Sequence, residues 1–131
     1  MRECVLDASV VLEWFRPPGP SGDGAGQLRI DFESGDLEVV APSLVHLEIL
    51  NVAGRRWGWS GEALQELAEG LEDLSFDLVE PELSAAARWV AAGLTPYDAA
   101  YVAVAEAAAI PLITSDETIL RLASGLAQPP S

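Results

Sequence analysis

The sequence predicts an α/β fold in which a mostly parallel sheet is sandwiched between helical layers. Short apolar segments alternate with amphipathic ones along the whole chain, which is the pattern of parallel strands joined by helices. Half of the residues are hydrophobic, and this proportion suits a sheet that is covered on both faces. We expect a single domain over residues 1–131, because a chain of this length has no room for a second core.

The N-terminal segment is expected to begin with a buried strand. Residues 3–6 form a short, mainly apolar run, and the Asp7-Ala8-Ser9 that follows is typical of a strand that ends at a helix start. Short helices are expected over residues 10–15 and 27–33. The Pro and Gly residues between positions 17 and 26 predict a surface loop between these two helices.

The rest of the chain continues the alternation. The other expected strands cover residues 37–41, where Pro42 ends the strand, 76–79, 110–114 and, at the edge of the sheet, 126–128. The other expected helices cover residues 43–57, 61–74, 82–94, 96–109 and 116–123. In sheets of this kind ligands bind beyond the carboxyl ends of the strands, where the strand order reverses. Acidic residues at strand ends are therefore candidate site residues.

The chain is strongly acidic. Seven basic residues oppose 21 acidic ones, which gives a net charge of −14 at pH 7, and all seven basic residues are arginine. Non-specific binding to nucleic acid comes from cations that neutralise phosphates, so an RNA substrate would have to be held by local arginines and bound metal. The charge is also explained by solubility, or by a strongly basic partner.

The sequence also predicts a cytoplasmic protein. Its longest apolar runs fall short of the roughly 20 residues that span a bilayer. Glu3 and Asp7 interrupt the N-terminus in a way that excludes a signal peptide. The single cysteine, Cys4, cannot form an internal disulfide and is expected to be an inert buried thiol.

Four acidic residues are candidates for chemistry. Asp7 and Asp116 each close an expected strand and open an expected helix, so each is explained equally well as a helix N-cap and as a ligand. Glu48 lies on or beside the buried stripe of its helix, where it is either functional or a carboxylate that reaches solvent at the edge. Asp98 is at the third position of a helix that follows the N-cap Thr95, where the helix dipole also favours an acid.

Together these four acids predict a metal site. The predicted fold would bring the strand-end acids to one rim, where several carboxylates repel one another and at least one pKa rises. A hard cation such as Mg²⁺ or Mn²⁺ prefers oxygen ligands and removes this repulsion. The chemistry that such a site supports is phosphodiester hydrolysis by a metal-activated water.

Four stretches of the sequence resemble the signature motifs of PIN-domain ribonucleases, most closely the VapC-type toxins of bacterial toxin–antitoxin pairs. They are VLDASVVLEWF, APSLVHLEILN, TPYDAAYVAVAE and LITSDETIL. The resemblance runs from Glu3 to about Leu122, and TPYDAAYVAVA is its most specific part.

The resemblance implies a three-layer α/β/α sandwich and a Mg²⁺- or Mn²⁺-dependent endoribonuclease that leaves a 5′-phosphate and a 3′-hydroxyl. It assigns to the metal site Asp7, Glu48, Asp98 and Asp116. It gives supporting positions to Ser9, Asn51, Thr114 and Ser115. It also implies a homodimer that a cognate antitoxin silences. The Gly-rich segment from Gly19 to Gly26 is the least typical part of the chain.

Two further groups of residues have more than one interpretation. Arg55 and Arg56, together with Arg16, either contact RNA phosphates or complete a solvated helix end. Trp57 and Trp59 either stack on bases, form a partner surface, or pack beneath a helix junction.

Two other functions compete with the nuclease. A Mg²⁺-dependent phosphotransferase or phosphatase shares the fold class, but the related receiver domains and phosphatases use a lysine to neutralise the phosphoryl group, and this chain has none. A non-catalytic PIN-like binding module is the second alternative. Because all four acids are present, nothing in the sequence indicates that activity has been lost.

Overall fold

Five parallel strands form one sheet in the order β3-β2-β1-β4-β5 in the computed structural model, which describes residues 2–16 and 23–130. The strands are β1 (Arg2–Leu6), β2 (Leu37–Ala41), β3 (Asp77–Leu78), β4 (Leu112–Ile113) and β5 (Ala127–Gln128). The expected edge strand is confirmed, since β5 pairs with β4. The sheet is wholly parallel within the described residues, where the sequence predicted a mostly parallel one.

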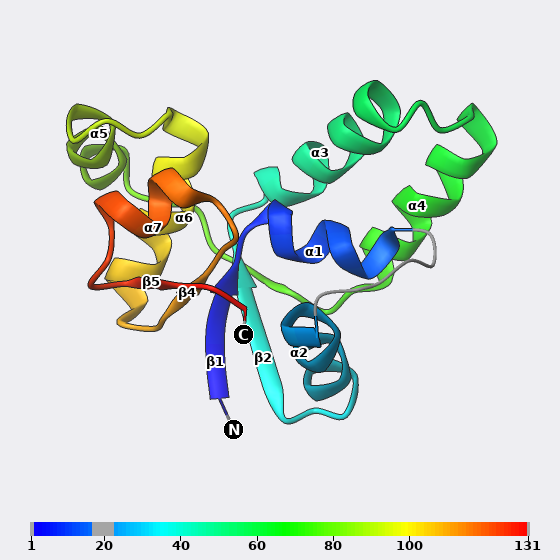
Figure 1. Cartoon of the computed structure of the whole chain (residues 1–131), viewed down its shortest axis with the longest axis horizontal. Coiled ribbons are helices and arrows are strands. Elements are labelled where there is room, and N and C mark those ends of the chain that lie inside the picture. Colours follow the sequence, from blue (N-terminus) through cyan, green and yellow to red (C-terminus); the bar gives the residue numbers. More distant parts are fainter. Residues whose placement is uncertain (1, 17–22, 131) are drawn as a thin grey trace.

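Helices cover both faces of this sheet (Figure 1). They are α1 (Ala8–Phe15), α2 (Asp23–Glu33), α3 (Leu44–Asn51), the π-helical turn η1 (Val52–Arg56), α4 (Gly61–Asp73), α5 (Leu83–Ala91), α6 (Pro96–Ala108) and α7 (Glu117–Leu122). The chain moves from β1 to β3 in one direction and returns from β3 to β5 in the other. Because crossovers between parallel strands are right-handed, α1–α4 lie on one face and α5–α7 on the other. The predicted three-layer α/β/α sandwich is confirmed.

Several predicted boundaries differ from the observed ones by a few residues, and the two largest differences concern the start of α2 and the end of α3. The loop expected over residues 17–26 is helical from residue 23, because α2 begins at Asp23; residues 17–22 lie outside the described residues. The indole Nε1 of Trp14 donates to the carbonyl of buried Ala25 at 2.9 Å, and this packing outweighs the low helix propensity of the glycines. The helix expected over residues 43–57 ends at Asn51 and continues as η1.

The core lies on both sides of the central strands. Val5 and Leu6 of β1 are fully buried, and residues 99–105 of α6 are all buried as well. A helix that is apolar on all sides is one that is covered on all sides, and α6 contacts β1 and β4 as well as α5. Cys4 is buried as predicted, and burial raises the pKa of its thiol to about 11, so it stays protonated at neutral pH.

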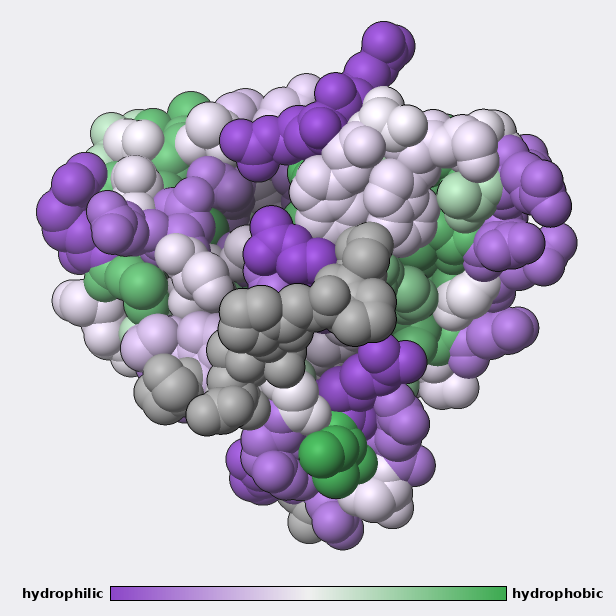
Figure 2. Space-filling model, turned by 45° about the vertical axis from the view of Figure 1, so that its right-hand side comes forward, coloured by the Kyte–Doolittle hydropathy of each residue, from purple (hydrophilic) through white to green (hydrophobic). Residues whose placement is uncertain are grey.

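On the face seen in Figure 2, hydrophilic side chains cover most of the outline, with smaller hydrophobic areas exposed between them. None of the helices within residues 2–16 and 23–130 has the length and apolar character that a membrane span needs.

The end of α6 generates a stability prediction. Ala109 caps this helix in the left-handed conformation, with φ 56° and ψ 41°, where a Cβ is disfavoured. We expect Ala109→Gly to raise the free energy of unfolding by about 0.5–1 kcal/mol, less than the full strain because glycine also has a freer unfolded state. Urea denaturation measures the change.

The matched control is Ala108→Gly, in the last helical turn of α6. This substitution should lower the free energy of unfolding by about 0.5–1 kcal/mol. If both variants are destabilised equally, the left-handed conformation of Ala109 is wrong.

Candidate functional site

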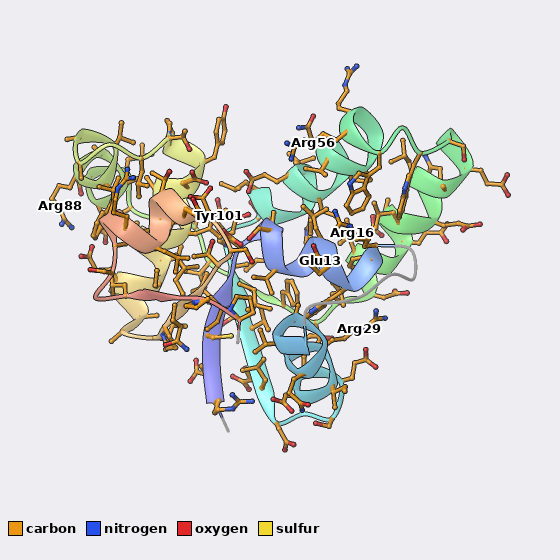
Figure 3. The ribbon with its side chains drawn as sticks, in the orientation of Figure 1. Glu13, Arg16, Arg29, Arg56, Arg88 and Tyr101 are labelled. Atoms are coloured by element: carbon orange, nitrogen blue, oxygen red, sulfur yellow. The ribbon has the colours of Figure 1, made fainter. Side chains whose placement is uncertain are left out.

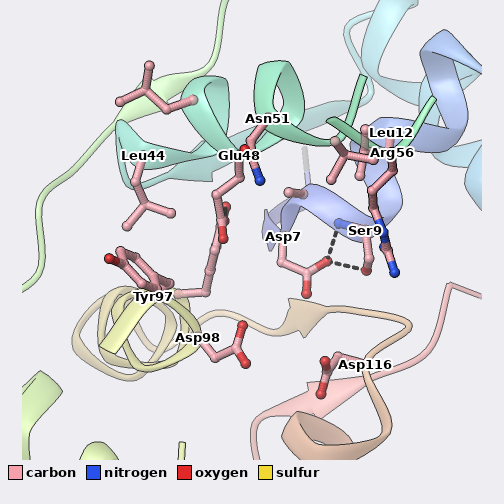
Figure 4. Close-up of a pocket in the computed structure, with 14 residues that line it drawn as sticks. Asp7, Ser9, Leu12, Leu44, Glu48, Asn51, Arg56, Tyr97, Asp98 and Asp116 are labelled. Carbon is pink, nitrogen blue, oxygen red and sulfur yellow. Dashed lines mark hydrogen bonds between the residues drawn. The ribbon is translucent and has the colours of Figure 1, made fainter. Parts of the chain in front are cut away.

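A cavity of about 550 Å³ opens at the carboxyl end of the sheet, between α3 and α6. The four acids proposed from the sequence all line it: Asp7, Glu48, Asp98 and Asp116. They come from four different segments of the chain and point into one space (Figure 4). Ser9, Asn51, Arg56, Tyr97 and Tyr101 also line the cavity.

The topology of the sheet explains why these acids meet. Strand β1 lies between β2 and β4, so the chain leaves β1 towards one side and later returns on the other. This is the point of strand-order reversal at which ligands bind in open parallel sheets. Asp7 directly follows β1, and Asp116 follows β4 after two residues. α3 and α6 flank the same edge and bring Glu48 and Asp98.

Asp7 is the most buried of the four acids, with 5% of its surface exposed. Its Oδ1 accepts from the backbone N–H of Ser9 at 3.1 Å and from the Ser9 hydroxyl at 2.5 Å. Its Oδ2 accepts from the hydroxyl of fully buried Thr114 at 2.5 Å. Burial raises the pKa of the Asp7 carboxyl above its usual range, although these hydrogen bonds oppose the rise. Asp7 is therefore both a helix N-cap and a carboxylate directed towards the cavity.

Two hydroxyl groups connect the end of β1 to the end of β4. Thr114 donates to Asp7 and accepts from the backbone N–H of Asp116 at 3.0 Å. Ser9 donates to Asp7 and accepts from the backbone N–H of Ser115 at 3.1 Å. The segment that carries Asp116 is thus fixed relative to Asp7. Asp116 also caps α7, since its Oδ1 accepts from the backbone N–H of Ile119 at 2.9 Å.

Glu48 is held by a residue that the sequence analysis did not identify. The hydroxyl of Tyr101, which is 1% exposed, donates to Oε1 of Glu48 at 2.5 Å. Burial raises the pKa of the Glu48 carboxyl, and the charges of Asp98 and Asp7 raise it further. Tyr101 follows Asp98 by three residues, so both side chains lie on one face of α6. This spacing was the available signal for Tyr101.

Asp98 is more accessible than Asp7. Thr95 caps α6 by accepting from the backbone N–H of Asp98 at 3.1 Å, as the sequence predicts. Burial raises the pKa of the Asp98 carboxyl and the nearby charge of Asp116 adds to the rise, while a hydrogen bond with the Thr95 side chain opposes it. The Asp98 side chain still lines the cavity.

The donor chemistry of the cavity fits a hard divalent cation, because carboxylate oxygens come from four sides. Within residues 2–16 and 23–130, however, no three His, Cys, Asp or Glu side chains are grouped closely enough to enclose a metal ion. The carboxyl groups of Asp7, Glu48 and Asp116 are each held by a hydrogen-bond donor of their own. Mg²⁺ commonly retains several waters and binds through one or two carboxylates with substrate phosphate, so it does not require a closed cage.

The arginines and tryptophans of the sequence analysis occupy different places. Arg56 lines the cavity, whereas Arg55 is exposed outside it. Arg16 forms an ion pair with Glu13 at 3.1 Å, and the two residues lie side by side in Figure 3. The guanidinium of Arg16 also lies 5.7 Å from the ring centroid of Trp57. Trp57 and Trp59 are half-buried and pack against each other, with ring centroids 5.5 Å apart.

A model of the PIN domain family matches residues 4–125 of the sequence. The chain belongs to this family. No curated protein matches it significantly in sequence. PIN domains are generally nucleases that hydrolyse phosphodiesters and typically use divalent metal ions, which agrees with an acidic cavity of this kind.

Solved structures share the fold of this PIN domain. PAE2754 from Pyrobaculum aerophilum is 26% identical, with a TM-score of 0.66 over 92% of this chain and 86% of that chain. FitAcB from Neisseria gonorrhoeae is 18% identical, with a TM-score of 0.64 over 97% of each chain. VapBC-1 from nontypeable Haemophilus influenzae is 14% identical, with a TM-score of 0.69 over 98% of each chain.

The raised pKa of Glu48 generates a prediction about pH. Below its ordinary pKa of 4.5 this carboxyl is protonated in both folded and unfolded states. Between this value, at which the carboxyl ionises in the unfolded state, and the higher pKa of the folded state, ionisation favours unfolding, so the metal-free protein loses stability as the pH rises through this window. The Glu48→Gln variant does not lose stability in this way, and its side-chain amide oxygen can still accept the hydrogen bond from the Tyr101 hydroxyl. We expect the variant to gain stability relative to the wild type as the pH rises from 4 towards 8, in urea denaturation with EDTA.

Glu62→Gln is the control for this series, because Glu62 is exposed in the first turn of α4. Its stability relative to the wild type should not show the same rise with pH. A Glu48→Gln profile parallel to that of the wild type would contradict the assigned environment of Glu48.

Proposed function

We propose that this PIN domain is a Mg²⁺- or Mn²⁺-dependent endoribonuclease that acts in the cytoplasm as the toxin of a toxin–antitoxin pair. The observation that carries the proposal is the convergence of Asp7, Glu48, Asp98 and Asp116 on one cavity. In the described part of the chain none of these four carboxyl groups forms an ion pair with an arginine. Burial raises the pKa of Asp7, Glu48 and Asp98, and neighbouring carboxylates raise the pKa of Glu48 and Asp98 further; a bound cation would offset this cost.

Three of the four acids have distinct roles in this proposal. Asp7, fixed by Ser9 and Thr114, is the most rigid ligand. Tyr101 orients Glu48 towards the same space. Asp98, which lines the cavity and is less buried than Asp7, would offer oxygen to a cation or to a water. A bound cation would activate water for attack on phosphorus and stabilise the leaving oxygen.

Asp98→Asn tests the nuclease function. The substitution keeps the size of the side chain and the cap made by Thr95, and it removes one charge from the cavity. We expect cleavage of an RNA oligonucleotide with Mn²⁺ to fall by at least about a hundredfold, in the range of losses seen when one electrostatic catalytic group is removed. Cleavage should be read as fragments bearing a 5′-phosphate.

Glu62→Gln is again the matched control, since Glu62 is also an acid in the first turn of a helix but lies outside the cavity. It should retain wild-type cleavage. The competing hypothesis is a non-catalytic PIN-like module, which the separation of the carboxyl groups would favour. Absence of Mn²⁺-dependent cleavage by the wild type would support that alternative.

Metal binding can be tested apart from activity with Asp116→Asn. Asparagine is as good an N-cap as aspartate, so the substitution removes charge and keeps the start of α7. Without metal, we expect the variant to melt at a higher temperature than the wild type, because repulsion with Asp98 is relieved. Saturating Mg²⁺ should raise the melting temperature of the wild type more than that of the variant. Equal shifts would show that Asp116 is not a ligand.

The proposed partners are a cognate antitoxin and a second copy of the chain. The fold is shared with FitAcB and VapBC-1, and a net charge of −14 suits a basic partner. A short basic protein encoded beside this chain is the candidate antitoxin. Adding it at equal concentration should abolish cleavage, and light scattering of the chain alone tests the homodimer.

A further inference from the structure

We propose that Arg56 binds a phosphate of the substrate beside the acidic cavity, and that the π-helical turn η1 selects Arg56 over its neighbour Arg55 for this task. The inference rests on the proposed nuclease function and assigns one of its substrate contacts.

Arg56 is the one cationic side chain that lines the cavity in the part of the chain that the structure describes. In Figure 4 its side chain extends past Leu12 on the same side as Ser9. Four other arginines are paired with acids elsewhere: Arg2 with Asp31, Arg16 with Glu13, Arg29 with Glu33 and Arg88 with Glu106. Arg56 forms no ion pair within the described residues, so its guanidinium is available to a ligand.

The negative charge of the cavity explains why an unpaired arginine is needed there. An RNA strand that approaches four carboxylates in a protein of charge −14 is repelled. A guanidinium at the rim offsets this repulsion locally. Its planar set of N–H donors also matches the oxygens of a phosphate, which gives orientation as well as charge.

The helix geometry decides which arginine reaches the cavity. An α-helix makes almost two turns in seven residues, so in a continuous helix Arg55 would share the direction of Glu48, and Arg56 would point about 80° away. The structure shows the opposite, since Arg56 lines the cavity and Arg55 does not.

The π-helical turn accounts for this exchange. In η1 the backbone N–H of Trp57 donates to the carbonyl of Val52, five residues earlier, at 3.0 Å. The wider turn accommodates one additional residue. Arg56 therefore takes the direction that Arg55 would have in an α-helix, and it follows Leu44, Glu48 and Val52 at intervals of four along the cavity wall.

Packing holds this turn in place. Ala53 is fully buried, and its carbonyl accepts from the backbone N–H of Trp59 at 3.0 Å. Trp59 packs on Trp57, over which the guanidinium of Arg16 lies. The two tryptophans thus stabilise the junction after α3, which favours the packing interpretation of these residues.

The test measures RNA binding separately from cleavage. In an Asp98→Asn background with Mn²⁺, the Kd for a fluorescent single-stranded RNA is measured by anisotropy for added Arg56→Ala and Arg55→Ala substitutions. We expect Arg56→Ala to weaken binding by roughly tenfold to a hundredfold, as for a lost charge-assisted hydrogen bond. It should also reduce the slope of log affinity against log salt by about 0.7. Arg55→Ala, a neighbouring exposed arginine, should change the Kd by less than about threefold.

Two further measurements make the test decisive. In the otherwise wild-type chain, Arg56→Ala should raise KM far more than it lowers kcat, and Arg56→Lys should recover only part of the affinity because it lacks the planar fork. The affinity for Mn²⁺ alone should not change in Arg56→Ala. Equal losses for Arg55→Ala and Arg56→Ala would overturn the inference, as would tighter Mn²⁺ binding with unchanged RNA affinity. A wild type that binds RNA through Arg56 without cleaving it would refute the nuclease function and leave this inference standing.

Discussion

The burial of one negative charge at the end of the central strand is the constraint on which the rest of the site depends. Asp7 is almost entirely removed from solvent, and a carboxylate in that position is costly unless it is hydrogen-bonded or paired. Ser9 and Thr114 supply donors, and the same two hydroxyls join the end of β1 to the segment after β4. The groups that make the buried charge tolerable are therefore the groups that fix Asp116 beside it. Its raised pKa indicates that hydrogen bonds alone do not fully offset the burial.

Much of the fold could be predicted from the sequence because strands and helices alternate with clear apolar patterns, and even the short strand β5 was identified. The start of α2 could not be predicted, since it depends on the contact between Trp14 and the carbonyl of Ala25, residues that lie on different helices. The turn η1 was missed for another reason: a π-helical turn and an α-helical turn have similar apolar spacing and differ in one hydrogen-bond register. Asp7, Asp98 and Asp116 were identified by their positions at strand ends and helix starts, and Glu48 was identified by its place beside the apolar stripe of a helix. Their separation within the cavity depends on hydrogen bonds such as that from Tyr101 to Glu48, which no local pattern reveals.

The distribution of charge would place unusual demands on the proposed action of this protein on RNA, which is a polyanion. Most of its arginines neutralise acids on the surface, so they do little to attract nucleic acid over a distance. Long-range forces oppose the encounter, and they weaken as salt is added. In the proposed nuclease, recognition would then depend on contacts made after the substrate arrives.

The small buried side chains of α6 make the site sensitive to substitutions at positions that do not line the cavity. Ala99, Ala103 and Ala105 are at most 2% exposed, and the helix that contains them also carries Asp98 and Tyr101. Additional methylene groups in a filled interior force the backbone to move. A larger side chain at one of these alanines would shift α6 as a rigid body. Asp98 would move with it, and so would Tyr101, which orients Glu48. Loss-of-function alleles should therefore arise at hidden alanines that never touch a substrate.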